Sequence, residues 1–511
     1  MALVLAVILC LVCGFALASL GWPRSAGLGS AVLLRASLTG PFGLAVFSII
    51  FFIGRVFGVS HLVALDLIAG TMLAAAAARR RSQGDPQGLK PALIAAPGGT
   101  AEAVPYPAVP FPVVPCSDRI GSAGSGTGKR ISHPVWLERV VTAGFVVSVG
   151  AAVYSAWLRA WARPQGSGWD AFAIWNLHAR FLFRGGGHWR DGFSPLISWS
   201  HPDYPLLLPA AVAHFWSYLG HDEPAVPAVI GLVFTFCTVG LLCAALWLLR
   251  GRSCALLGGL ALLSTPAFID LGTWQYADVP LSFFLLATVV FLCLRDERAG
   301  SSPGLLALAG VAAGFAAWTK NEGVLFLCAI VLALAWHMGR ERSRKMSSQG
   351  FEGRRVSTIP LLAALTPVLV VIIYFKRFVA PPGDLFSDPA SMLHKVLELA
   401  RYWAVIKWYA TEFFRFGHWL AIPGTLLLVG FYFAVAKEQH ARRGPGFRAA
   451  VVGLALTLAG YFAVYLITPL DIYWHLRFSL DRLFLQVWPA VIFLFFLSVR
   501  AGEQSAAGDR I

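Results

Sequence analysis

The sequence predicts an all-α polytopic membrane protein, and its composition, its apolar runs and the placement of its basic residues support this. Of 511 residues, 57% are hydrophobic and 13% are charged, and the mean hydropathy is +0.68. Soluble domains carry about 25% charged residues. Several apolar runs reach the roughly 17–25 residues that cross a bilayer as a helix. The runs fall at approximately 1–21, 38–56, 59–78, 140–160, 225–249, 254–273, 279–294, 304–318, 324–338, 359–378, 416–436, 449–468 and 483–499.

Basic residues predict the orientation of these spans. They gather in the segments after the third, fifth, seventh, ninth, eleventh and last runs, for example Arg79–Arg81 and Arg340–Lys345. If all of these segments are cytoplasmic, about thirteen spans alternate without a violation, with the N-terminus outside and the C-terminus inside. The net charge of +15 is therefore typical of positive-inside loops, and nucleic acid is not expected as a partner.

The frame divides the chain into four parts. Residues 1–78 form extra N-terminal transmembrane helices, and residues 79–139 form a Pro/Gly/Ala-rich cytoplasmic loop that we expect to be disordered. Residues 140–500 form the main transmembrane module, and residues 501–511 form a cytoplasmic tail. The loop contains "AGSGTGKR", but it lacks the first Gly, the Ser/Thr and the preceding strand of a phosphate-binding loop.

Two outer segments are expected to hold shorter helices. The large outer loop at 161–224 contains Tyr204–Gly220, which is apolar but short and carries two prolines. Counting it as a span would place every later basic loop outside, so an interfacial or re-entrant helix is expected there. A further outer segment at about 379–415 predicts an amphipathic helix lying on the membrane.

Polar residues collect on the outer face in this frame. The large loop contributes Trp169, Asp170, Arg180, His201 and Asp203. Asp170 could cap a helix that begins at "WDAFAIW", since Asp suits an N-cap. Its aromatic neighbours favour a different role, because a carboxylate beside aromatic rings can bind a sugar and deprotonate one of its hydroxyls.

Further outer turns supply Asp278, Lys320 and Glu322. Asp278 precedes Pro280 and opens the next span, so it could also be an N-cap. Lys320 and Glu322 could neutralise each other within a hairpin. Placing charged residues near the membrane costs free energy, and such residues tend to have a function. This favours a functional role for the pair.

The last outer loop contains "WHLRFSLDR", in which His475, Ser479 and Arg482 are spaced i, i+4 and i+7. These three donors share one helical face, and such a face suits a phosphate group. The alternative is an interfacial anchor helix with a snorkelling arginine.

Acidic residues for proton transfer and cationic residues for a phosphate therefore gather on the outer side, without an ATP motif or a metal-ligand cluster. A lipid-phosphate-activated sugar would supply the energy, because its phosphate is the leaving group and its tail lies in the membrane. A lipid-linked-sugar flippase or another transporter is the alternative, but it predicts ionisable residues in mid-span along a path. A non-catalytic membrane scaffold is the third interpretation.

Four segments resemble bacterial glycosyltransferases of the GT-C superfamily. "WDAFAIWNLHARFLF … HPDYPLLLP", "YADVPLSFFLL", "WTKNEGVLF" and "TPLDIYWHLRFSLDRL" look like the RgtA/B/C/D-like group, which is related to protein O-mannosyltransferases and aminoarabinose transferases. The resemblance covers roughly 136–500 in matching order, while residues 1–78 and the Pro/Gly/Ala-rich loop lie outside it. It implies the GT-C fold, a multi-pass protein of the bacterial inner membrane and an active site facing the periplasm.

The resemblance also implies roles for individual residues. The donor would be a polyprenyl-phosphate monosaccharide, transferred with inversion to a hydroxyl of a glycan, lipid or protein. Asp170 matches the general base and Asp278 the second acidic residue of such enzymes. Lys320, His475 and Arg482 are candidates for holding the lipid phosphate by position and chemistry. Many relatives need no metal and some are stimulated by a divalent cation, so no metal ligand is assigned and a divalent cation is left open as a cofactor.

Overall fold

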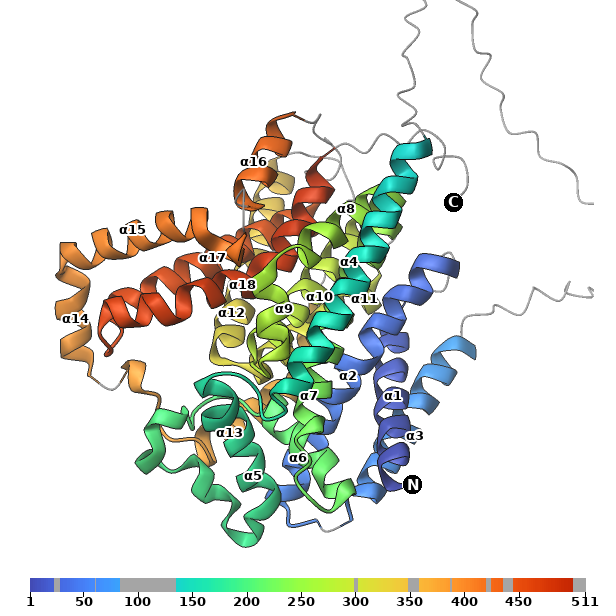
Figure 1. Ribbon diagram of the computed structural model, residues 1–511, viewed down its shortest axis with the longest axis vertical. Helices are drawn as coiled ribbons and strands as arrows, with labels where there is room; N and C mark the ends of the chain where they lie inside the picture. Colours follow the sequence, from blue (N-terminus) through green and yellow to red (C-terminus); the bar gives the residue numbers. More distant parts are fainter. Residues whose placement is uncertain are drawn as a thin grey trace, which may run out of the picture.

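The structure is a computed structural model of the chain, and every regular element that it describes is a helix. It describes residues 1–22, 28–59, 61–82, 135–297, 302–347, 358–386, 388–419, 424–434 and 444–499. Most of the expected loop at 79–139 and the expected tail at 501–511 lie outside these residues. The helices form one bundle, with shorter helices at its lower end and at one side (Figure 1).

Within the described residues, ten helices are long and apolar enough to cross a membrane, which confirms the all-α polytopic class. Each has few charged residues over a window of 18 positions. A helix satisfies its backbone hydrogen bonds internally, as the interior of a lipid bilayer requires. These helices are α1 (Ala2–Gly21), α2 (Leu28–Val56), α3 (Leu62–Ser82), α4 (Val135–Ala162), α7 (Ala225–Arg250), α10 (Asp278–Asp296), α12 (Asn321–Ser347), α13 (Ile359–Phe378), α17 (Pro445–Ile467) and α18 (Ile472–Ser498).

Three of the expected thirteen runs are not among these ten helices: one is a broken pair, one is a shorter helix, and one is described over only part of its length. One run is divided into α8 (Arg252–Leu263) and α9 (Pro266–Thr273), which are bent by 66° and raise the count to eleven if they form one span. Pro266 explains the break, because the residue before a proline is disfavoured in a helix. The other two runs are α11 (Pro303–Thr319) and α16 (Gly424–Ala434).

The large outer loop folds into compact short helices between α4 and α7 (Figure 1). The expected short apolar segment forms α6, which is buried from Leu207 to Trp216 and packs on α2 and α5. Its interfacial or re-entrant position in the membrane stays a prediction. The elements are a π-helical turn η1 (Ala171–Trp175), α5 (Asn176–Arg184), the 3-10 turns η2 (Gly186–Phe193) and η3 (Pro195–Ser200), and α6 (Leu207–Leu219).

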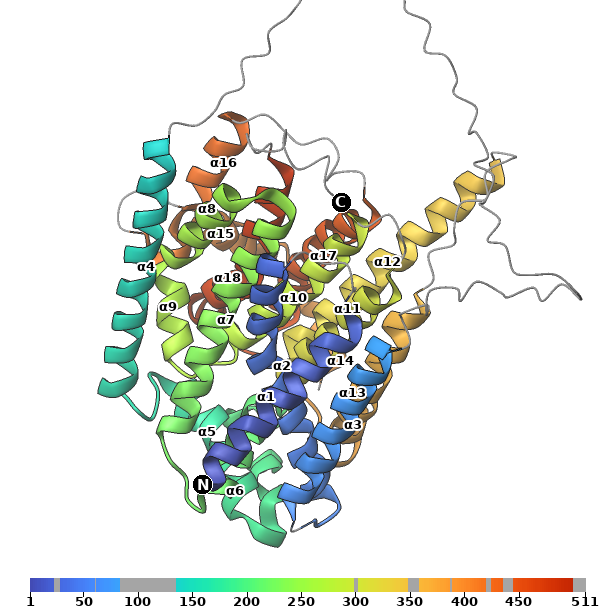
Figure 2. The same cartoon turned by 90° about the vertical axis from the view of Figure 1, so that its right-hand side faces the viewer.

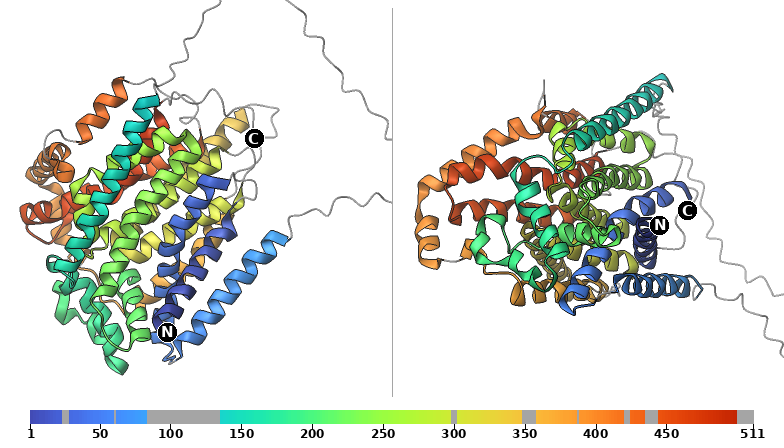
Figure 3. Two further views of the ribbon diagram at one scale, coloured as in Figure 1. Left: turned by 45° about the vertical axis from the view of Figure 1, so that its right-hand side comes forward. Right: turned by 60° about the horizontal axis from the view of Figure 1, so that its bottom comes forward.

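The second outer segment forms two helices where one was expected. After the short turn η4 (Asp384–Phe386), α14 (Pro389–Leu397) and α15 (Leu399–Arg415) are separated at Glu398. The two views in Figure 3 and Figure 1 agree that α14 and α15 flank α17 and α18 at one side of the bundle. On α15, Leu399, Trp403 and Phe414 are exposed, so this helix keeps an apolar outer face.

The N-terminal helices pack directly on the rest of the bundle. Figure 2 shows α1, α2 and α3 alongside it, and α2 lies between α1 and α7. Gly14 and Gly43 allow α1 and α2 to approach closely, because a Cβ at Gly14 would lie 1.8 Å from the carbonyl oxygen of Thr39. A buried pair, His214 Nε2 and Asp66 Oδ2 at 2.9 Å, joins α6 to α3. The contacts of α6 with α2 and α3 therefore hold the outer loop on the bundle.

Cysteine labelling tests the proposed orientation. We expect Leu196→Cys, on the exposed outer loop, to react with a membrane-impermeant maleimide added to the outside of intact cells. Gly339→Cys, near the opposite end of α12 in open space, is the matched site and should react only after the membrane is opened. The reverse pattern would contradict the orientation deduced from the basic loops.

Candidate functional site

Arg482 of α18 joins the two carboxylates that the sequence singled out as catalytic. Its Nη2 donates to Asp170 Oδ2 at 2.7 Å and to Asp278 Oδ2 at 2.8 Å, and its Nε donates to Asp278 Oδ2 at 3.0 Å. Its guanidinium also lies 4.7 Å from the ring centroid of Tyr276, a distance at which cation and ring attract. One side chain therefore links the outer loop, the start of α10 and α18.

Asp278 is the buried anchor of this cluster. Its side chain is fully buried, and its Oδ1 accepts from Lys320 Nζ at 3.1 Å and from Gln486 Nε2 at 2.6 Å. Gln486 is oriented in turn by the hydroxyl of Tyr461, which donates to its Oε1 at 2.8 Å. Asp278 makes no capping hydrogen bond for α10, so the alternative interpretation as an N-cap is not supported. A buried carboxylate is stable only when paired and hydrogen-bonded in this way.

Asp170 is more open than Asp278. Its side chain is 20% exposed and makes no capping hydrogen bond for the helix that follows, so its position is not explained by capping. The preceding Gly168 has φ +76, and a Cβ there would lie 2.4 Å from the hydroxyl of Tyr276. The glycine thus lets the chain turn against Tyr276 and presents Asp170 to Arg482.

Lys320 and Glu322 do form the pair considered from the sequence. Lys320 Nζ lies 2.8 Å from Glu322 Oε1, and it also contacts Asp278, so the pair belongs to the larger cluster. Lys320 directly follows the last residue of α11 and has an extended backbone, and α12 begins at the next residue, Asn321. Burial lowers the pKa of Lys320, but the Asp278 and Glu322 carboxylates raise it by more, so the pKa lies above its ordinary value and the side chain is a cation.

His201 and Asp203 border the cluster. His201 has φ 50 and stacks on Tyr204 with 4.7 Å between ring centroids. Burial lowers the pKa of His201, which favours a neutral ring at pH 7. Asp203 Oδ2 accepts from Asn321 Nδ2 at 2.7 Å, and Lys376 Nζ lies 3.6 Å from the same oxygen. These contacts fix the end of the outer loop to α12 and α13.

The three phosphate-binding candidates on α18 all have partners within the protein. His475 Nδ1 lies 2.9 Å from Thr468 Oγ1, Ser479 Oγ lies 2.7 Å from the hydroxyl of Tyr465, and Arg482 holds the two carboxylates. Their role in phosphate binding stays a prediction, and it requires that a ligand competes for these contacts.

Two predicted substrate-binding residues lie outside the cluster. The Trp169 side chain is 55% exposed and packs edge-on against Phe172 and Trp199, with ring centroids 5.4 and 5.7 Å away. Arg180 Nε donates to Asp222 Oδ2 at 3.3 Å, and Arg184 contacts the same carboxylate. Arg180 therefore stabilises the outer loop in this structure, and its predicted contact with substrate stays untested.

Three members of the cluster were not predicted as site residues. Gln486 follows Arg482 by four residues and so continues the series of His475, Ser479 and Arg482 on one helical face. The spacing could therefore have predicted it. Tyr276 precedes Asp278 by two residues in "YADVP" and was hidden among the other aromatics. Tyr461 comes from α17, and nothing local in its sequence marks it.

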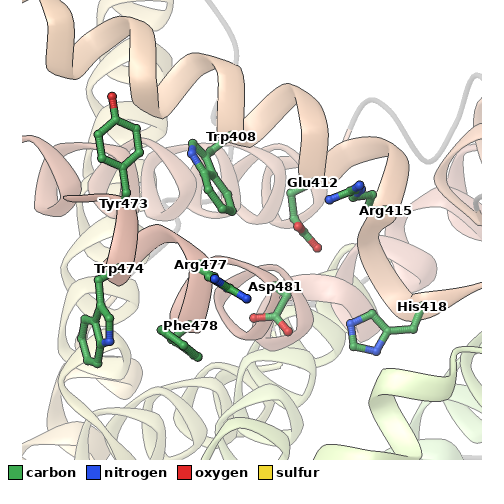
Figure 4. A pocket seen from close by; sticks show the side chains of 9 residues that line it. All are labelled: Trp408, Glu412, Arg415, His418, Tyr473, Trp474, Arg477, Phe478 and Asp481. Carbon is green, nitrogen blue, oxygen red and sulfur yellow. The ribbon is translucent and has the colours of Figure 1, made fainter. Parts of the chain in front are cut away.

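A cavity of about 790 Å³ lies beside α18 and was also not predicted (Figure 4). It opens between α15, the turn η5 (Phe416–His418) and the N-terminal part of α18. Its walls carry Asp481, the neighbour of Arg482, but none of the predicted site residues. The charged cluster and the cavity are therefore two adjoining features that share α18.

The described residues do not offer a ready metal site. Among them no group of three or more His, Cys, Asp or Glu side chains is placed to hold a metal ion. Asp170 and Asp278 are the carboxylates that could share a cation, and the Arg482 guanidinium already bridges them. In this arrangement the space between the two carboxylates suits the Arg482 guanidinium better than a metal ion.

The cluster combines three carboxylates with two cations. Asp170, Asp278 and Glu322 face Arg482 and Lys320, so three carboxylates meet two cations and one negative charge remains. Asp170 has the most exposed side chain of the three, and it is therefore the candidate for accepting a proton from a bound hydroxyl. Arg482 and Lys320 are the donors best placed to compensate a growing negative charge nearby.

A model of the dolichyl-phosphate-mannose-protein mannosyltransferase family matches residues 200–374. The match confirms the resemblance to GT-C glycosyltransferases and supports a membrane glycosyltransferase of the GT-C type. It includes Asp278, Lys320 and Glu322, whereas Asp170 and Arg482 lie outside the matched residues. No match was found among the curated proteins or the solved structures that were compared.

Substitution of Asp278 tests the buried anchor. Asp278→Asn removes the negative charge of the fully buried carboxylate that pairs with Arg482 and with Lys320. Breaking a buried pair costs about 3–5 kcal/mol, so we expect a lower thermal unfolding temperature in detergent, measured by tryptophan fluorescence. Asp191→Asn, at an exposed carboxylate of the outer loop, is the matched control. Equal unfolding temperatures for wild type and Asp278→Asn would contradict the anchor role.

Proposed function

We propose that the protein transfers a monosaccharide from a polyprenyl-phosphate donor to an acceptor hydroxyl on the outer face of the bacterial inner membrane. The contact of the partly exposed Asp170 with Arg482, which is anchored by the buried Asp278, is the observation that carries this proposal. The family match over residues 200–374 supports the transferase class.

The position of the cluster favours chemistry over transport. Asp278 is the first residue of α10, and Lys320 lies at the junction of α11 and α12, so these charges stand at helix ends on the side of the outer loop. A transport path would place ionisable groups through the middle of the spans. The outer-end placement instead lets a membrane-anchored donor meet an acceptor at the surface.

The proposed reaction is a single displacement with inversion. The acceptor oxygen forms a bond to the anomeric carbon of the donor sugar while the bond from that carbon to the phosphate oxygen breaks. Asp170 takes the proton of the attacking hydroxyl, and polyprenyl phosphate leaves with the electron pair of the broken bond. As its negative charge grows, the leaving phosphate draws Arg482 and Lys320, with His475 as a further donor. This shift weakens the hold of Arg482 on Asp170 and makes that carboxylate a better base.

Asp278, in this scheme, acts through Arg482 and Lys320. It is fully buried and already accepts hydrogen bonds from three side chains, so it has little capacity to take a proton from substrate. It positions the two cations, and the other predicted residues, His201, Asp203 and Glu322, orient the surrounding groups.

Asp170→Asn tests the proposed base. General-base catalysis contributes about 10²–10⁴-fold, so we expect at least a hundredfold loss of transfer with purified protein and the productive member of a panel of polyprenyl-phosphate sugars. The measured product is released polyprenyl phosphate, and donor binding should remain within a fewfold of wild type. Asp191→Asn should keep full activity. Wild-type turnover by Asp170→Asn would overturn the assignment.

Chelation tests the cofactor side of the proposal. Because Arg482 occupies the space between Asp170 and Asp278, we propose that transfer proceeds without a divalent cation. Activity after dialysis against EDTA should equal the activity in added Mg²⁺ or Mn²⁺. Loss of activity in EDTA that is restored by one of these ions would show that a metal takes part.

A further inference from the structure

The cavity beside α18 has walls of mixed chemistry. Its volume of about 790 Å³ falls in the range of about 300–1,000 Å³ that is typical of small-molecule sites. Aromatic rings and ionisable groups face it together (Figure 4). The residues that line it are Trp408, Glu412, Arg415, His418, Tyr473, Trp474, Arg477, Phe478 and Asp481.

The ionisable groups on the walls are not engaged with one another. Figure 4 shows Glu412 and Arg415 of α15 opposite Arg477 and Asp481 of α18. In the described part of the chain no ion pair within 4.0 Å joins these four side chains, and Asp481 accepts only the backbone N–H of Arg482, at 2.8 Å. Opposite charges that face a shared space without pairing leave both donors and acceptors available to a ligand.

The balance of charges indicates a neutral, hydroxyl-rich ligand. Two arginines are matched by two carboxylates, so the walls have no excess positive charge for a phosphate. The half-exposed rings of Tyr473, Trp474 and Phe478 offer apolar surface. A sugar ring presents C–H groups on its faces and hydroxyls at its edge, so it can pack on the aromatic rings while carboxylates accept from, and guanidinium groups donate to, its hydroxyls.

The cavity also lies next to the charged cluster around α18. Trp474, Phe478 and Asp481 each precede by one residue the cluster-facing His475, Ser479 and Arg482. One residue turns an α-helix by about 100°, so the two sets occupy neighbouring faces and not opposite ones. The cavity therefore lies on the face of α18 next to the one that carries Arg482, the partner of Asp170.

We propose that the cavity between α15 and α18 binds the saccharide that accepts the transferred sugar. This inference rests on the proposed function and names the acceptor class, a saccharide chain in place of a protein or a simple lipid. Trp408 and Trp474 would contact its ring faces, and Glu412, Arg415, Arg477 and Asp481 would contact its hydroxyls.

The experiment compares transfer with hydrolysis in one reaction. The full-length protein is incubated with its productive polyprenyl-phosphate sugar and with oligosaccharides released from the envelope glycan of its native host. Transfer is measured as the mass gain of one monosaccharide on an oligosaccharide, and hydrolysis as the free monosaccharide. Trp408→Ala and Asp481→Asn are compared with Trp403→Ala, a tryptophan of the same helix that is 69% exposed and outside the cavity.

We expect Trp408→Ala and Asp481→Asn to lower the ratio of transfer to hydrolysis at least tenfold and to raise the KM for the oligosaccharide. Trp403→Ala should keep the wild-type ratio, and equal unfolding temperatures would show that the variants are folded. An unchanged ratio in both cavity variants would overturn the acceptor site, as would loss of transfer and hydrolysis in equal proportion. Failure of wild type to release polyprenyl phosphate would instead overturn the proposed function.

Discussion

Arg482 carries one positive charge between two carboxylates that are 312 and 204 residues away in the sequence. Because Asp278 is fully buried, its charge is tolerated only while Arg482, Lys320 and Gln486 hold it. The same guanidinium reaches the more exposed Asp170 and so fixes the outer loop to the bundle. These contacts join the start of α10, the junction of α11 and α12, and α18 at the site.

The surrounding fold can be understood as support for that contact. Gly168 lets the loop turn against Tyr276, whose ring faces the guanidinium, and the contacts of Asp203 with Asn321 and Lys376 hold the far end of the loop. Within the loop, the buried α6 packs on α2 and is joined to α3 by the pair of His214 and Asp66, which attaches the loop to the N-terminal helices. In the proposed reaction, Asp170 is thereby kept in place before substrate arrives, and such preorganisation lowers a barrier.

The sequence predicted the all-α class and the grouping of Asp170, Asp278, Lys320 and Arg482, because hydrophobic runs, basic loops and a helical i, i+4, i+7 spacing are local patterns. It did not predict that α6 is buried, since burial depends on α2 and α5, which are far away in the chain. It also did not predict that Arg180 pairs with Asp222. That partner, like the cavity between α15 and α18, depends on how distant segments pack, and no local spacing reveals it.

The central claim is that Arg482 serves both the base and the leaving phosphate, and a structure with a bound donor analogue tests it most directly. The measured quantities are the distances from the Arg482 guanidinium to Asp170 and to the nearest phosphate oxygen. We expect a phosphate oxygen within hydrogen-bond distance of Arg482 and Lys320, and a contact from Arg482 to Asp170 that is longer than the 2.7 Å of this structure. A phosphate bound away from both cations, with the contact between Arg482 and Asp170 unchanged, would contradict it.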